Sequence, residues 1–331
     1  MIRPTFPLLL VLTTCFPLLS ACSDDEREPR GAEALRVGYS ALRISLPVFV
    51  AKERGLFEAE GLDVELQRYE TAQPLVEEVL DERVLAGGFA ALPIVFTAAS
   101  RDASEVRLAL AMVEDAAHPV SYLLRRPGDT SISSVSDLRG KTVGILPTVA
   151  YRRWLDAMLV HAGVPLSEVS VVALAPPQQT AALEHGGVDA LFTNDPMATA
   201  TIARGVGVSV GEVAPVTAVS GGSLVFGSFL VSPRLARERP GVVARLLRAL
   251  DDATRLIHAD QSAARQAMAR YVRAPERPYV TRYPDARYLT STEFDDGALS
   301  GAVRSMLDLG VLPEPIDVTG WTLRAERPAA P

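Results

Sequence analysis

Few residues in this chain stand in a pattern that could carry covalent chemistry. Gly140-Lys141-Thr142 lacks the upstream glycine of a phosphate-binding loop, because that position is Val135. The segment 207–211 matches a nucleophile elbow, but Pro215 follows where that motif needs a helix. The four histidines have no spacing typical of zinc ligands or of a catalytic triad. We therefore expect no catalytic residues, no metal site and no cofactor.

Four loops that follow predicted strands and precede predicted helices hold side chains suited to binding a small molecule. Ligands of open α/β sheets bind beyond the carboxyl ends of the strands, and N–H groups at helix starts favour an anion or a carbonyl oxygen. Two aromatic residues of these loops would offer a flat apolar wall. We therefore predict a ligand-binding cleft from these loops and a later glycine-rich segment, formed by Tyr39, Ser40, Arg43, Phe89, Ala90, Thr148, Val149, Tyr151, Asn194, Asp195, Ser220 and Gly222.

Several polar members of this set have more than one interpretation. Arg43 either pairs with an anionic group of the ligand or lies on the surface. Asn194 offers a donor and an acceptor to a polar ligand edge, and Asp195 either contacts ligand or only caps a helix that Pro196 opens. The segment 220–223 is either a ligand loop or a hinge. Because no basic cluster marks these loops, the sequence favours a small, partly apolar organic solute over nitrate or a strongly acidic ligand.

The elements that must position these loops alternate between β-type and helical patterns. Thr148 and Ser232 stand where helix caps are expected, and Thr290 with Glu293 has capping-box spacing. The alternation favours parallel sheets flanked by helices. The expected strands cover 35–39, 62–66, 87–90, 106–113, 120–125, 141–146, 169–174, 188–192 and 224–231, and the expected helices cover 47–57, 73–80, 93–99, 149–162, 178–185, a segment from 196, 242–259, 262–271 and 293–309.

Length and charge limit the class of protein. At roughly 100–200 residues per domain, 331 residues suggest two domains, and 48% hydrophobic residues can build a core in each. A net charge of -7 without a basic run gives no electrostatic footprint for nucleic acid, so none is expected as a partner. Both cysteines fall within the first 22 residues, which excludes a disulfide framework.

The N-terminal segment predicts the compartment. Arg3 precedes an apolar run over 6–19, and polar residues follow from Ser23, which is the pattern of a signal peptide too short to span a membrane. Leu19-Ser20-Ala21-Cys22 resembles the lipobox of bacterial lipoproteins. We therefore predict that residues 1–21 are removed, that Cys22 is lipidated, and that 22–34 form a flexible tether. The folded part would then work outside the cytoplasmic membrane, in a periplasm or on the outer cell face; an ordinary secretory signal is the alternative.

Four segments resemble extracytoplasmic solute-binding proteins for nitrate, sulfonates, taurine and thiamine-precursor pyrimidines. The first is Leu46–Val64, in which Gly55 ends a helix and Gly61 turns the chain into a strand. The others are Ala86–Pro93, Val135–Gly144 and Ala182–Pro196, and together they cover about residues 35–232. The sequence is thus identified as a suspected member of this group.

The resemblance implies a type II periplasmic-binding-protein-like α/β fold with two lobes, each a mainly parallel sheet flanked by helices, joined by two crossover strands. Lobe one would comprise 35–122 and 223–331, and lobe two 123–222. It also implies a monomeric receptor that delivers a small solute to an ABC permease and its ATPase. A ligand-sensing lipoprotein without transport remains an alternative, as does an enzyme on this fold. The pyrimidine-forming enzyme of this fold relies on a cysteine-rich motif that is absent here.

Overall fold

The computed structural model describes residues 1, 32–81, 85–102, 105–211 and 214–325. The compact unit spans 32–331, and everything below concerns that unit. The predicted signal peptide, the lipidated Cys22 and most of the tether lie outside the described residues. The tether prediction is wrong at its end, because Glu33 already pairs with Leu62 in a parallel ladder. No helix in the described ranges is both long and apolar enough to cross a membrane.

The first sheet has six strands in the order β11-β4-β10-β3-β1-β2. Strand β1 runs parallel to β2 and to β3, whereas β10 runs antiparallel to β3 and β4, and β11 antiparallel to β4. Gly227 lets β10 approach β3 closely, since a Cβ there would lie 2.4 Å from the Ala90 carbonyl oxygen. The strands are β1 (Glu33–Ser40), β2 (Leu62–Tyr69), β3 (Gly87–Ala91), β4 (Arg107–Asp115), β10 (Ser223–Val231) and β11 (Arg287–Leu289).

The second sheet has five strands in the order β7-β6-β8-β5-β9. Here β6 runs parallel to β7 and β8, whereas β5 runs antiparallel to β8 and β9. The chain passes from the first sheet to the second between β4 and β5, and returns between β9 and β10. The strands are β5 (Ser121–Arg125), β6 (Thr142–Ile145), β7 (Ser170–Ala173), β8 (Ala190–Asn194) and β9 (Val208–Ser209).

The α/β class with two helix-flanked sheets is confirmed, but both sheets are more mixed than the expected mainly parallel ones. The reason lies in the strands that connect them. Strand β4 runs toward the second sheet and β10 runs back from it, so the two lie antiparallel with Asp115 opposite Ser223.

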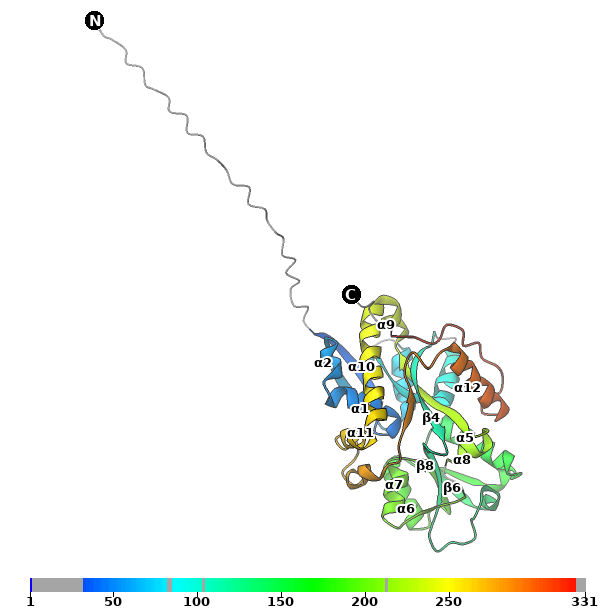
Figure 1. Ribbon diagram of the computed structural model, residues 1–331. Helices are drawn as coiled ribbons and strands as arrows, with labels where there is room; N and C mark the ends of the chain where they lie inside the picture. The colour runs from blue at the N-terminus through cyan, green and yellow to red at the C-terminus, as the bar shows by residue number, and fades with distance from the viewer. Residues whose placement is uncertain (2–31, 82–84, 103–104, 212–213, 326–331) are drawn as a thin grey trace. The chain divides into compact units, whose positions relative to one another are not determined.

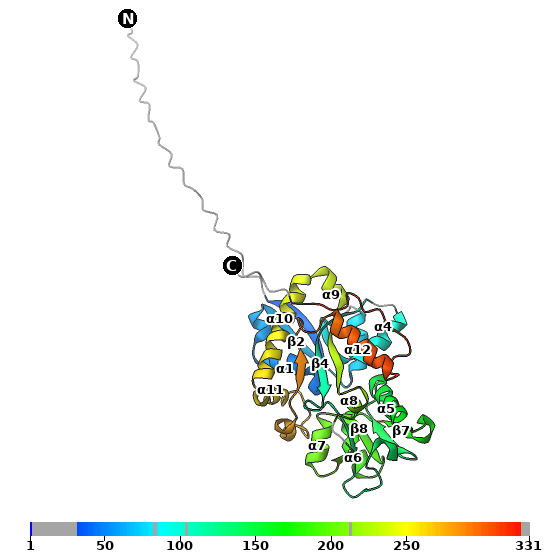
Figure 2. The same cartoon turned by 45° about the vertical axis from the view of Figure 1, so that its right-hand side comes forward.

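Helices cover both sheets (Figures 1 and 2). Helices α1, α10 and α11 pack together on the first sheet, whereas α5, α6, α7 and α8 lie with the second sheet at the other end of the unit. The described helices are α1 (Leu46–Glu53), α2 (Leu56–Ala59), α3 (Ala72–Leu80), α4 (Leu92–Asp102), α5 (Val149–His161), α6 (Pro176–Glu184), α7 (Met197–Ala203), α8 (Pro215–Val219), α9 (Pro233–Glu238), α10 (Pro240–Ala259), α11 (Gln261–Met268) and α12 (Asp296–Asp308), with short 3-10 turns at Arg43–Ser45, Val135–Leu138, Leu166–Glu168 and Arg277–Arg282.

Local capping rules explain several helix starts. The Thr148 hydroxyl accepts a bond from the Tyr151 N–H at 3.4 Å, and the Ser232 hydroxyl accepts one from the Leu235 N–H at 3.3 Å, which confirms both predicted caps. The predicted start of the last helix, at residue 293, is wrong. Helix α12 begins at Asp296, and the Asp295 carboxylate accepts from the Ala298 N–H at 2.9 Å.

Candidate ligand-binding site

A small cavity lies where the two sheets meet. Residues of the first sheet and its loops form one wall, and residues that follow β6 and end β8 form the other. Its volume is about 30 Å³, which has room for water but not for an organic solute. The lining residues are Ser40, Leu42, Ile44, Glu70, Thr71, Ala72, Ala91, Ile94, Leu146, Thr148, Ala150, Tyr151, Asn194 and Phe226.

Four of the residues predicted from sequence come together in this lining: Ser40, Thr148, Tyr151 and Asn194. Ser40 ends β1, Asn194 ends β8, and the other two lie where β6 leads into α5. The rule that ligands bind beyond the carboxyl ends of the strands is what selected them.

Three of these side chains carry a buried polar atom without a partner. Within the described chain, the Ser40 hydroxyl, the Tyr151 hydroxyl and Asn194 Oδ1 make no hydrogen bond. Tyr151 is 3% exposed and Asn194 4%. An unsatisfied buried polar group costs about 1–3 kcal/mol, so these atoms are suited to a ligand that would complete them.

Arg43 and Asp195 form a buried pair beside the cavity and are not part of its lining. The Arg43 Nη2 atom lies 3.7 Å from Asp195 Oδ2, and both side chains are buried. Arg43 also donates through Nη1 to the Pro284 carbonyl at 2.7 Å and through Nη2 to the Pro119 carbonyl. The guanidinium thus joins the turn between β4 and β5, the segment before β11 and the end of β8.

Asp195 bonds to the first turn of α7, but it is not the N-cap that the sequence predicts. Its Oδ1 accepts bonds from the Thr199 N–H at 3.0 Å and the Thr199 hydroxyl at 2.6 Å. Helix α7 itself begins at Met197, and Pro196 is the boundary residue. Among the described residues no hydrogen bond is formed to the other carboxylate oxygen, Oδ2, which faces Arg43 and lies near Tyr122.

Glu114 is a buried carboxylate that the sequence prediction missed. Its Oε1 accepts from the Ser121 N–H and hydroxyl, both at 2.6 Å, and from the Val120 N–H at 3.0 Å. Burial raises the pKa of this carboxyl, against the lowering effect of those bonds. Glu114 fastens the end of β4 to the start of β5. One feature of the sequence could have identified Glu114: a charged residue directly follows the apolar strand predicted over 106–113.

Burial also raises the pKa of the Tyr151 hydroxyl well above its ordinary value. The carboxylates of Glu114 and Asp195 raise it further, and Arg43 and the adjacent Asn194 side chain oppose them. Tyr151 therefore remains a neutral hydroxyl at physiological pH, able both to donate and to accept a hydrogen bond.

The remaining predicted site residues lie outside this lining. Tyr39 packs edge-on against Phe49 at 5.2 Å between ring centres, and Phe89 packs against Phe229 at 5.3 Å. Successive side chains of a strand point to opposite faces, which separates Tyr39 from Ser40. Of the others, Ala90 lies within β3, Val149 lines a neighbouring depression, and Ser220 and Gly222 lie in the turn before β10.

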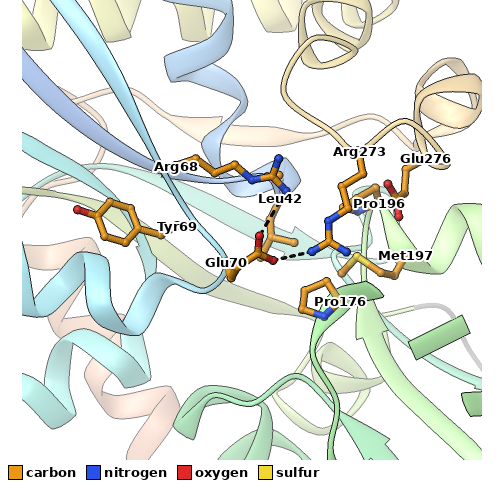
Figure 3. A pocket seen from close by; sticks show the side chains of 10 residues that line it. Leu42, Arg68, Tyr69, Glu70, Pro176, Pro196, Met197, Arg273 and Glu276 are labelled. Carbon is orange, nitrogen blue, oxygen red and sulfur yellow. Dashed lines mark hydrogen bonds and ion pairs between the residues drawn. The ribbon is translucent and has the colours of Figure 1, made fainter. Parts of the chain in front are cut away.

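A second, smaller space of about 20 Å³, here called the mouth, adjoins the cavity, and Leu42 and Glu70 line both. Figure 3 shows the side chains that line the mouth. The Glu70 carboxylate accepts from Arg273 at 2.5 Å and lies 3.6 Å from Arg68. Pro176, Pro196 and Met197 of the second sheet's helices face this ion-pair network (Figure 3). No sequence pattern indicated the mouth, because Arg273 lies 203 residues from Glu70 along the chain.

Comparison with known proteins identifies the family. Residues 44–264 match the sequence profile of the family described as NMT1/THI5 like. The chain belongs to this family. The match runs from the first turn after β1 into α11. It therefore includes the second sheet and most of the first, while β1, β11 and the lining residues Ser40 and Leu42 lie outside it.

Several relatives share the whole fold. A Brucella abortus protein named provisionally as a binding protein is 24% identical over 304 residues, which cover 87% of this chain and 90% of that one. The crystal structure of the periplasmic aliphatic sulphonate binding protein SsuA from Escherichia coli gives a TM-score of 0.68 at 17% identity, covering 88% and 97%. The ligand binding component of an ABC-type import system from Staphylococcus aureus gives 0.69 at 11%, also covering 88% and 97%.

An enzyme has the same fold. The desulfurization enzyme DSZB gives a TM-score of 0.59 at 19% identity, covering 87% of this chain and 96% of its own. At such identities the likeness shows the fold alone. The periplasmic nitrate-binding protein NrtA from Synechocystis PCC 6803 also has this fold, with a TM-score of 0.63 at 14% identity, covering 85% of this chain and 83% of that one.

Proposed function

We propose that this NMT1/THI5-like protein is a lipid-anchored extracytoplasmic receptor that closes two lobes around a small organic solute and delivers it to an ABC permease with its ATPase. Residues 35–122 with 223–331 would form one lobe and 123–222 the other. The observation that carries the proposal is the set of unpartnered Ser40, Tyr151 and Asn194 atoms, contributed from both sides of the cavity. The named roles of the Escherichia coli and Staphylococcus aureus neighbours support it.

Solute capture requires the two sheets to separate. A space of about 30 Å³ admits no organic solute, so the described arrangement is that of a closed cleft. A solute that contacts both walls would bind the closed form better and shift the population toward it. The permease would then recognise the closed surface.

A thermal-shift screen tests the receptor role. Residues 23–331, which contain the compact unit, would be screened against sulfonates, taurine, nitrate, thiamine-pathway pyrimidines and other small aromatic or zwitterionic solutes. A micromolar ligand at millimolar concentration should add about 4 kcal/mol to the free energy of unfolding. A folded, ligand-free protein that no solute stabilises would contradict the proposal.

An enzyme on this fold is the second candidate, because DSZB shares it. Incubation of the protein with each solute that stabilises it, followed by mass spectrometry, separates the two. A receptor returns the solute unchanged, whereas an enzyme yields product with time.

Lipid anchoring is tested by the mass of the N-terminal peptide, in which Cys22 should carry the acyl chains.

A further inference from the structure

The chemistry of the cavity wall restricts the charge of its ligand. The polar lining side chains are hydroxyls and an amide, from Ser40, Thr71, Thr148, Tyr151 and Asn194. Among the described lining residues the one charged side chain is Glu70, which lies at the mouth and is engaged by Arg273 and Arg68. No lysine, arginine or histidine of the described chain belongs to the lining.

The nearest guanidinium is already occupied. Both terminal nitrogens of Arg43 donate to main-chain carbonyls, at Pro284 and Pro119, and Asp195 lies 3.7 Å away. Its Nε has no partner, but Arg43 does not line the cavity. A buried anion without a cationic partner is strongly disfavoured. A sulfonate or nitrate group would have only hydroxyls, an amide and the first turn of α5 to stabilise its charge here.

Two acidic side chains lie near the cavity wall. Glu114 and Asp195 both raise the pKa of the buried Tyr151 hydroxyl, and Arg43 lowers it. The unpartnered Asn194 Oδ1 is an acceptor. The wall therefore favours a group that donates hydrogen bonds.

We propose that the solute bears no negative charge on its buried part, has a mostly apolar body, and donates an N–H or O–H group to Asn194 Oδ1. The same ligand would complete the Tyr151 and Ser40 hydroxyls, while Leu42, Ile44 and Phe226 contact its body. This inference rests on the proposed receptor function and names the chemical class of its solute.

Three probes with one apolar body and different polar groups test the inference: benzamide, benzylammonium and benzenesulfonate. Binding would be measured by isothermal titration calorimetry on the full chain. We expect benzamide or benzylammonium to bind at least tenfold more tightly than benzenesulfonate. Tighter binding of benzenesulfonate would overturn the inference and leave the receptor function standing. Binding of none of the three at 10 mM would overturn it too, and the solute screen would then decide on the receptor.

Two variants and a control locate the contact. N194L replaces an unsatisfied acceptor by an apolar group and should weaken benzamide binding at least tenfold. Y151F removes only a hydroxyl and should weaken it severalfold, which keeps the test valid if N194L folds poorly. Y279F removes a hydroxyl away from the cavity and should change nothing. Unchanged benzamide affinity in both N194L and Y151F would contradict the inference.

Discussion

Arg43 shows how one buried side chain can join distant parts of the chain. Its guanidinium contacts the Pro119 and Pro284 carbonyls and faces Asp195. An arginine suits this position because its fixed fork of donors can serve several acceptors at once. The sequence placed Arg43 near the cleft, but the partners lie between 76 and 241 residues away along the chain, so no local pattern could have named them.

Removal of the Asp195 charge should destabilise the protein. D195N keeps an oxygen that can accept from Thr199 but leaves Arg43 without its counter-charge. We expect a loss of about 1–3 kcal/mol in the free energy of unfolding, measured in urea. D317N is the matched control, because Asp317 also accepts a bond from a threonine N–H, at 3.0 Å, yet is exposed. Equal effects of the two substitutions would contradict the role assigned to the buried pair.

Glu114 should make stability depend on pH. Its pKa is higher in the folded protein than in the unfolded chain, so the folded state holds the proton more tightly. The stability that this group contributes is therefore present at low pH and lost as the pH rises from about 4.3 through the folded pKa. The difference in unfolding free energy between the wild type and E114Q should fall as the pH rises from 4.5 to 8. A difference that stays constant across this range would refute the assignment.

At the scale of elements, the sequence predicted the features that depend on neighbouring residues, namely helix caps and helix ends. The Thr148 and Ser232 caps and the helix break at Gly55, with φ of 66°, follow from single residues and their neighbours. The order and direction of the strands cannot be predicted in this way, because they depend on which distant strands pair. The sequence thus located the strand ends that build the cavity but not Glu114 or the mouth. The alternation of side chains along β1 would have separated Tyr39 from Ser40.

The ion pairs at the mouth should control access to the cavity. E70A removes the carboxylate that Arg273 and Arg68 contact and that lines both spaces. We expect the association rate of a bound solute to rise severalfold in stopped-flow measurements, because fewer contacts must break when the cleft opens. E65A is the control, since Glu65 pairs with Arg36 at 3.4 Å on the exposed side of β2. An unchanged rate in E70A would show that the mouth does not limit entry.

The whole molecule couples two mixed sheets through the two places where the chain crosses between them. Asp115 and Ser223 lie opposite each other there, and Glu114 binds the start of β5 from the same point. Motion at these crossings would separate the cavity walls, and it would also break packing that joins the sheets, such as Trp154 against Phe226 with ring centres 4.3 Å apart. The buried pair of Arg43 and Asp195 would hold the walls together once closed.

The most direct test of solute capture between the sheets is the distance between them with and without solute. Spin labels at V172C on β7 and L256C on α10 occupy exposed positions, 38% and 44% accessible, on the second and first sheets' sides. In a chain with Cys22→Ser and Cys15→Ser, pulsed electron–electron double resonance should show a broad distribution without solute. A stabilising solute from the screen should convert it to one shorter distance. A bound solute that leaves the distribution unchanged would contradict closure of the two sheets around it.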